Sequence, residues 1–263
     1  MQSIKSNISR FFPLKEAGEK NCDVCGSVIK LYETPRGVTG ACKECTDRAL
    51  IHSLNLPKIE DLQNEKLSAF ISNFEKVTSD IENATVRSYK GIHNTQLKAK
   101  QIVIDYINEF DGTRSLVLSG TPGLGKSHLA FATVKALRIK KQHALFIKST
   151  HLLDQIKISY GNSGISEEQI FNMLGELDLL AIDDLGSEYV KSNGDGSESW
   201  ASDILYKIFD MRIEKATICT TNYAESELIK KYGNNGPRII SRMLNKAIGI
   251  RLDGEDFRRK EAF

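Results

Sequence analysis

A glycine-rich segment near the middle of the chain carries the residue types that most directly imply chemistry. Residues 120–127 read GTPGLGKS, which fits the phosphate-binding P-loop pattern G-x-x-x-x-G-K-[ST]. Glycines let the backbone wrap closely around an anion, so that successive N–H groups point at phosphate oxygens. The lysine can reach the β- and γ-phosphates, and the last hydroxyl can bind Mg²⁺. We predict a nucleoside triphosphate site made by this loop and the histidine after it: Gly120, Thr121, Pro122, Gly123, Leu124, Gly125, Lys126, Ser127 and His128.

Acidic and amide side chains end two other apolar segments. Asp183 and Asp184 end the run LDLLAIDD, and Asn222 ends the run ATICTTN. An acid at such a strand end can hold Mg²⁺ opposite the P-loop hydroxyl, and a second acid can polarise an attacking water. We predict that Asp183 and Ser127 bind Mg²⁺, that Asp184 activates water, and that Asn222 contacts the γ-phosphate or that water. The alternatives are a solvated acidic strand end and, for Asn222, a turn residue.

Two arginines near the C-terminus have helical spacing. Arg238 and Arg242 lie four residues apart in PRIISRM, so a helix would place them on one face. A cation at the γ-phosphate of a neighbouring subunit would stabilise the charge of the transition state, as an arginine finger does. We predict this role for the pair; an exposed basic helix face is the alternative.

Four of the five cysteines form two close pairs. Cys22 and Cys25 are separated by two residues, as are Cys42 and Cys45, with sixteen residues between the pairs. This spacing fits a four-thiolate zinc site, which would be structural because no coordination position stays open. A redox dithiol and an iron–sulfur cluster are the alternatives. The fifth, Cys219, lies in an apolar run and is predicted to be a small core residue.

Periodicity predicts the elements that position these residues. An apolar strand before the P-loop and a helix after it favour a true phosphate loop over an ordinary glycine-rich turn. Strands are expected at 115–120, 143–148, 177–184, 216–222 and 247–252, helices at 97–110, 126–137, 151–160, 166–174 and 200–212, and a polar glycine-rich loop at 187–198. This alternation predicts an α/β fold, a parallel sheet with helices on both faces, whose ligands bind at the carboxyl ends of the strands.

The chain divides into three parts. Residues 1–48 have too few apolar side chains to fold on a hydrophobic core, so this cysteine-bearing module needs a staple such as zinc. Residues 49–80 are polar with some helical spacing and are expected to form a helical linker. Residues 81–263 carry the strand–helix alternation and the predicted nucleotide site.

Composition limits the classes of protein that fit. The chain has 263 residues, of which 40% are hydrophobic and 27% charged, as in globular domains. Its net charge of +2 does not by itself indicate nucleic-acid binding. No apolar run is long enough to span a membrane, and the N-terminus lacks a secretory apolar region. We therefore expect a cytoplasmic protein with no membrane partner.

In their order and spacing, the P-loop, the IDD and TTN strand ends and the RIISR helix resemble AAA+ ATPases. In particular, they resemble the DnaC/DnaI-type loaders of bacterial and phage replicative helicases. The resemblance covers residues 80–263, including a segment at 83–89 that lines the nucleotide base in that family and a terminal GEDFRR at 254–259. It implies a fold without a C-terminal lid domain.

The resemblance also implies ligands and partners. These are ATP with Mg²⁺, a replicative hexameric helicase engaged by the zinc module, single-stranded DNA, and self-association through the AAA+ domains, in a bacterial cell or from a phage gene. Basic and aromatic residues suit contact with phosphates and bases. The candidates for DNA contact are Lys148, Lys157, Tyr160 and Lys191, with a solvated surface as the alternative for each.

One residue departs from the usual AAA+ pattern. Asp184 stands where glutamate is common, and its side chain is one methylene shorter, which predicts slow hydrolysis. An adaptor that binds nucleotide with negligible turnover is therefore one alternative to a helicase-loading ATPase. An IstB-type transposition helper ATPase and a small-molecule kinase are the others. The cysteine module favours the loader, because IstB-type helpers usually begin with a helical region.

Overall fold

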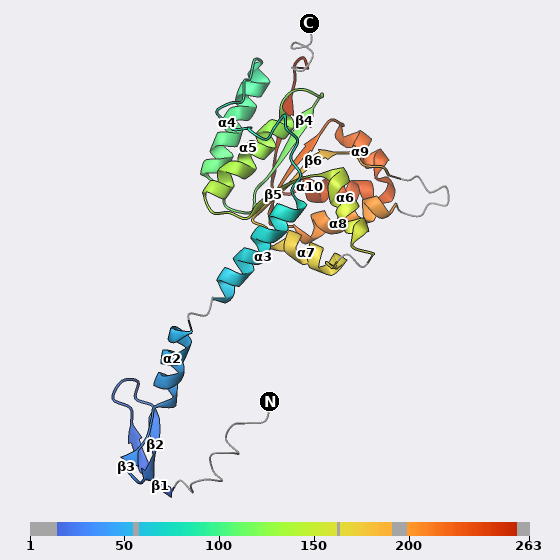
Figure 1. Ribbon diagram of the computed structural model, residues 1–263. Helices are drawn as coiled ribbons and strands as arrows, with labels where there is room; N and C mark the ends of the chain where they lie inside the picture. Colours follow the sequence, from blue (N-terminus) through green and yellow to red (C-terminus); the bar gives the residue numbers. More distant parts are fainter. Residues whose placement is uncertain (1–14, 55–57, 162–163, 191–198, 257–263) are drawn as a thin grey trace. The chain divides into compact units, whose positions relative to one another are not determined.

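The computed structural model describes residues 15–54, 58–161, 164–190 and 199–256. The chain divides into two compact units, Met1–Leu62 and Gln63–Phe263 (Figure 1). Part of the predicted 187–198 loop and the end of the GEDFRR segment, residues 191–198 and 257–259, lie outside the described residues.

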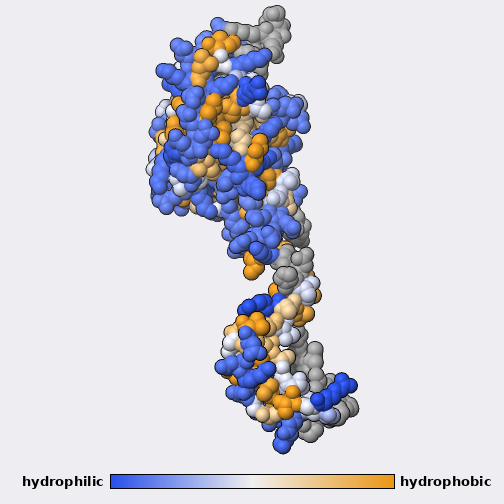
Figure 2. All heavy atoms as spheres, turned by 90° about the vertical axis from the view of Figure 1, so that its left-hand side faces the viewer, coloured by the Kyte–Doolittle hydropathy of each residue, from blue (hydrophilic) through white to orange (hydrophobic). Residues whose placement is uncertain are grey.

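The N-terminal unit is a small antiparallel sheet followed by a helix. Strands β1 (Lys15–Asn21), β2 (Val28–Thr34) and β3 (Gly37–Thr39) pair in that order, and α2 (Lys43–Ser53) follows. Among the described residues before Leu62, only Cys22 and Ile29 are buried apolar side chains. Hydrophobic residues instead reach the surface of this unit (Figure 2). The described part of this unit therefore has no hydrophobic core of its own, as its sequence predicts.

The C-terminal unit contains the predicted parallel sheet. Its strands lie in the order β5-β6-β7-β4-β8, and every neighbouring pair is parallel. The strands are β4 (Ser115–Gly120), β5 (Ala144–Lys148), β6 (Leu179–Leu185), β7 (Ala216–Thr221) and β8 (Ala247–Leu252). The strand prediction is confirmed, with shifts of one or two residues at some ends.

Helices connect these strands and cover both faces of the sheet (Figure 1). They are α3 (Ile59–Phe74), α4 (Asn94–Asn108), α5 (Lys126–Ile139), α6 (Ser149–Ile158), α7 (Glu167–Glu176), α8 (Trp200–Met211), α9 (Glu225–Lys231) and α10 (Gly236–Met243), with a 3-10 turn η1 (Gly233–Asn235) between the last two. The sequence did not predict α9, which is short and mostly charged. Across the described residues, no helix has the length and apolar character to cross a membrane.

Alternation along each strand divides the core into two layers. Leu116 and Leu118 of β4 join α4 and α5 in one buried cluster, whereas Val117 joins α3, α6, α7, α8 and α10 in the other. Successive side chains of a strand point to opposite faces, so a strand that is apolar throughout is buried on both. The result is the three-layer α/β architecture that the sequence predicts.

The strand order places the predicted functional segments along one edge. In the parallel sheet, the P-loop after β4, the acidic pair at the end of β6 and the TTN end of β7 all lie at the carboxyl edge. Strand β7 lies between β4 and β6, so its last residues stand between the P-loop and the acids.

Edge strand β5 is covered by a side-chain pair. Arg138 of α5 donates to both carboxylate oxygens of Glu75, at 2.8 and 2.5 Å, and through Nε to the Ala144 carbonyl at 2.8 Å. Glu75 also accepts from the backbone N–H of Phe146 at 3.2 Å. Exposed strand edges promote association, and here the pair satisfies two backbone groups of the edge while tying the end of α3 to α5.

Replacing Glu75 with alanine should lower the free energy of unfolding by about 2 kcal/mol, because a partly buried, two-bond ion pair and an edge hydrogen bond are lost together. Urea denaturation of the two proteins measures the difference. The matched control is Glu109→Ala, whose exposed carboxylate pairs with Arg114 and should contribute less than about 0.5 kcal/mol. Equal losses in the two variants would show that Glu75 is an ordinary surface partner.

Candidate functional site

A cavity of about 460 Å³ lies at the carboxyl edge of the sheet. The P-loop forms one wall and the ends of β6 and β7 form another. Of the predicted residues, those that line it are Pro122, Gly123, Leu124, Gly125, Lys126, Ser127, His128, Asp183, Asp184 and Asn222. Residues from segments 60 positions apart thus meet, in the arrangement that the sequence predicts for a bound triphosphate.

The P-loop needs its glycines for two separate reasons. Gly120, Gly123 and Gly125 have φ angles of 138°, 79° and 78°, which disfavour other residues. A Cβ at Gly125 would also lie 2.5 Å from Tyr89 Cε2. The Lys126 ammonium donates to the carbonyls of Gly120 and Thr121 at 2.7 and 2.8 Å. Gly120 and Thr121 therefore hold Lys126 in place through their carbonyls, although they do not line the cavity.

The segment before the helix α4 closes the cavity on the P-loop side. The Tyr89 hydroxyl donates to the Leu124 carbonyl at 2.8 Å, and its ring centroid lies 5.5 Å from that of His128. Burial raises the pKa of Tyr89 to about 12, so the hydroxyl remains a donor at neutral pH. Segment 83–89, which the family resemblance assigned to the nucleotide base, thus contacts the P-loop directly.

Asp183 is a buried carboxylate held by neighbouring hydroxyls. It is 2% exposed, and the Thr220 hydroxyl donates to its Oδ1 at 2.7 Å. Burial raises the pKa of Asp183, while hydrogen bonds from Thr220 and Ser127 oppose that rise. The link to Ser127 brings together the two residues predicted to bind Mg²⁺. Hydroxyl and carboxylate oxygens are ligands that this cation accepts.

Asp184 has an unusual backbone conformation. Its φ of 57° is left-handed, and the pairing of β6 with β7 shifts register between Ile182 and Leu185. The Asp184 N–H donates to the Thr220 hydroxyl at 2.8 Å, and Asn222 Nδ2 donates to Asp184 Oδ1 at 2.9 Å. Bulges of this kind redirect side chains next to active sites. Here the two successive carboxylates both line the cavity, with the amide of Asn222 between the second and the P-loop wall.

Sequence reasoning missed several residues that line this cavity, among them Thr220 and Lys148. Thr220 bridges the acidic pair, and Lys148, a candidate for DNA contact, lines the cavity and is paired in register with Asp183. Both end an apolar strand at the same sheet edge as Asp183, which is the signal that could have identified them. Of the other DNA candidates, Lys157 and Tyr160 are exposed at the end of α6, and Lys191 lies outside the described residues.

The structure does not bring the predicted arginines to this cavity. Arg242 Nε donates to Asp210 Oδ1 at 3.0 Å, and the Arg238 guanidinium lies 5.9 Å from the centroid of the Tyr206 ring. Arg242 borders a small cavity with Ser115 and Thr217, which are at the start of β4 and β7. Neither arginine therefore lines the nucleotide cavity of its own chain, and Arg242 lies near the opposite edge of the sheet.

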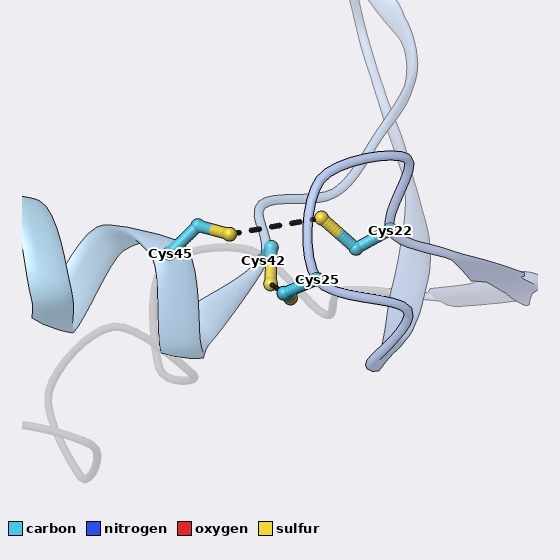
Figure 3. A group of neighbouring side chains, drawn as sticks. All are labelled: Cys22, Cys25, Cys42 and Cys45. Atoms are coloured by element: carbon cyan, nitrogen blue, oxygen red, sulfur yellow. Dashed lines mark hydrogen bonds between the residues drawn. The ribbon is translucent and has the colours of Figure 1, made fainter.

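The four paired cysteines converge in the N-terminal unit (Figure 3). Their sulfur atoms all lie within 4.8 Å of one another, with Cys22 to Cys45 at 3.8 Å and Cys25 to Cys42 at 3.4 Å. All four are free thiols. Tetrahedral zinc with Zn–S bonds of about 2.3 Å requires sulfur separations of about 3.8 Å. The donor set therefore fits a closed, structural zinc site.

Local contacts shift the pKa values of two of these cysteines in opposite directions. Hydrogen bonding with Ser27 lowers the pKa of Cys25 to about 6, whereas contacts with the other three sulfurs raise the pKa of Cys45 to about 12. Four thiolates this close repel one another, and a divalent cation removes that repulsion. Cys219, by contrast, is buried in the core of the other unit, as predicted.

Comparisons with known proteins agree with this architecture. Residues 65–263 match the family described as IstB-like ATP binding protein. The chain is 30% identical to the replicative helicase loader DnaC of Escherichia coli K12 over 183 residues, 68% of this chain and 71% of that protein. It is 27% identical over 169 residues to an insertion sequence IS232 ATP-binding protein of Bacillus thuringiensis, 62% of this chain and 64% of that one. The crystal structure of the DnaC helicase loader has a similar fold, with a TM-score of 0.58 at 24% identity over 67% of this chain and all of that one.

Substituting Thr220 with valine should weaken Mg²⁺-dependent nucleotide binding about tenfold, because the isosteric change removes the hydrogen bond to the buried Asp183 carboxylate and the one from the Asp184 N–H. Titration with a fluorescent ATP analogue, with and without Mg²⁺, measures the change. Thr133→Val is the control, since the Thr133 hydroxyl donates only to the Leu129 carbonyl within α5. The bridging role of Thr220 is wrong if both variants bind like the wild type.

The freshly purified protein should contain one zinc per chain. Cys42→Ser should lose that zinc, and Cys219→Ala should keep it, because only the first thiol belongs to the cluster. Elemental analysis together with a chromogenic zinc assay measures the content. Chelation should abolish the circular dichroism of the N-terminal unit and leave the unfolding transition of the C-terminal unit unchanged.

Proposed function

The chain belongs to the IstB/DnaC family of AAA+ ATP-binding proteins, and from this premise we propose that it is an ATP-dependent loader of a replicative DnaB-type helicase. It would bind the helicase and deliver it onto single-stranded DNA during replication. One observation carries the proposal: the residues expected to hold phosphate and Mg²⁺ line one cavity in a unit similar to DnaC, in a chain that also has a four-cysteine cluster.

The roles proposed in the ATP site follow from contacts within the cavity. Lys126 and the P-loop amides would bind the phosphates, and Ser127 and Asp183 would hold Mg²⁺. Asp184 would orient the attacking water, with Asn222 fixing its carboxylate. Because the aspartate is short and already accepts a hydrogen bond, we propose slow hydrolysis that acts as a switch.

The arginines support a site shared between subunits. Since Arg238 and Arg242 lie away from the cavity of their own chain, they can meet a γ-phosphate only in a neighbouring molecule. Arginine fingers supplied by another subunit stabilise the charge of the phosphoryl transition state. We propose self-association through residues 81–263, in which ATP lies at the interface.

The N-terminal residues are proposed to engage the helicase. Residues 1–48 would form the zinc module and 49–80 the connection to the ATPase domain. Within the small unit, Val24, Val28, Leu50 and Ile51 are all more than half exposed. Apolar side chains held at a surface by a zinc cluster suit a protein–protein contact. The protein would act in the cytoplasm, where reduced thiols remain available for zinc.

A transposition helper of the IstB type is the second candidate. The similarity to the IS232 protein favours it, and the ATPase fold would be nearly the same. The two functions differ in partner: a replicative helicase for the loader, a transposase for the helper. Affinity capture from the native host with the full chain and with a chain lacking residues 1–48 tests this. Helicase captured only by the full chain supports the loader, and transposase captured in its place rejects it.

Arg242→Ala should bind ATP like the wild type yet hydrolyse it at least about tenfold more slowly, because a finger acts on the transition state in the assembly. The assay is steady-state ATPase as a function of protein concentration. Wild-type activity per chain should rise with concentration, and that of the variant should stay flat. Arg114→Ala, which removes an exposed arginine paired with Glu109, is the control. A variant that still responds to concentration would exclude the finger role.

A further inference from the structure

A buried carboxylate outside the nucleotide cavity has no assigned role. Glu188 is 2% exposed and lies four residues after Asp184, in the segment that follows β6. No lysine, arginine or histidine pairs with it in the part of the chain that the structure describes. Burying a carboxylate without a cationic partner is unfavourable unless hydrogen bonds compensate, so the groups that donate to Glu188 determine what it does.

Three donors from separate elements converge on Glu188. The Gly186 N–H donates to its carboxylate at 3.1 Å, and the Ser149 hydroxyl of α6 donates to Oε2 at 2.6 Å. The Tyr232 hydroxyl donates to Oε1 in a short hydrogen bond. All three donors are neutral, so hydrogen bonds and not an ion pair hold the carboxylate in place.

These contacts brace the turn that carries Asp184. Asp184 and Gly186 have φ angles of 57° and 99°, two left-handed residues within three positions. The Ser149 hydroxyl also lies 3.1 Å from the Asp184 carbonyl, which accepts from the Ser187 N–H at 3.1 Å. Left-handed backbone at a non-glycine residue persists only where its surroundings over-determine it. Glu188 lies at the centre of these contacts, because it accepts hydrogen bonds from Gly186, Ser149 and Tyr232.

Tyr232 links the same turn to the arginine helix. Its ring is 1% exposed, and it is the C-cap of α9. The next residues form η1 and then α10, which carries Arg238 and Arg242. One hydrogen bond and a short stretch of backbone therefore separate the Asp184 turn from the helix that would face a neighbouring subunit.

We propose that Glu188 is a positioning residue that, through Tyr232, couples the orientation of Asp184 to the placement of α10. Packing of α10 against a neighbouring subunit then sets how readily Asp184 orients the attacking water. The inference rests on the proposed ATP site and assembly, and does not depend on which partner protein is loaded.

Tyr232→Phe tests the coupling, because it removes one hydroxyl and keeps the buried ring. Turnover should fall about tenfold, the value of one hydrogen bond to a charged group, with the KM for ATP within about twofold of the wild type. The matched control is Tyr106→Phe. Tyr106 is equally buried, its hydroxyl donates to the Arg114 carbonyl at 2.8 Å, and it packs on the opposite face of the sheet. Both kinetic constants of this control should match the wild type.

Hydrogen exchange gives a second readout that does not require turnover. In Tyr232→Phe, the amides of Gly186 and Ser187 should exchange faster, while the amides of β4 should be unaffected. Glu188→Gln, which keeps the volume but places an NH₂ among three donors, should show a larger effect on the same amides. Unchanged exchange in both variants, or equal kinetic losses in Tyr232→Phe and Tyr106→Phe, would overturn the proposal. If the wild-type protein fails to capture a helicase while the variants show these changes, only the loader function is refuted.

Discussion

One hydroxyl group, that of Thr220, holds together the part of the structure on which the site depends. It donates to the Asp183 carboxylate and accepts from the Asp184 backbone N–H, so a single oxygen atom positions two successive acidic residues. The donated bond offsets part of the cost of burying Asp183. The accepted bond satisfies an N–H that the register shift in β6 removes from the ladder. Because β7 lies between β4 and β6, this atom also fixes the acids relative to the P-loop.

Local patterns explain why so much of the fold could be predicted from the sequence. Strands that are apolar throughout and separated by amphipathic helices predict a parallel sheet, and loop chemistry marks the phosphate site. Helix α9 escaped prediction because its seven residues are mostly charged and show no apolar period. The cysteine cluster could be anticipated because two pairs of cysteines at this spacing are typical of a four-thiolate metal site.

The parts of the site that could not be predicted depend on register between strands that are distant in the chain. Nothing near Lys148 in the sequence indicates that it is paired with Asp183, and nothing near Asp184 indicates a left-handed backbone. The pairing of Asn222 with Asp184 has the same origin, since it needs the bulge as well as the strand order. Sequence patterns identify which residues end strands, whereas the hydrogen bonds across those ends decide their roles.

Under the proposed function, the arrangement would account for a chain that holds ATP without hydrolysing it rapidly. The P-loop, Lys126 and the buried Asp183 all line one cavity of a single chain, so the proposed nucleotide binding would not require assembly. The charge that develops on the transferring phosphoryl group needs a further cation, and both arginines of α10 lie away from that cavity. Asp184, already engaged by Asn222, has a shorter reach than the glutamate common in related ATPases. Under the proposed function, rapid hydrolysis would therefore require a neighbouring subunit, and ATP would stay intact until the assembly has formed.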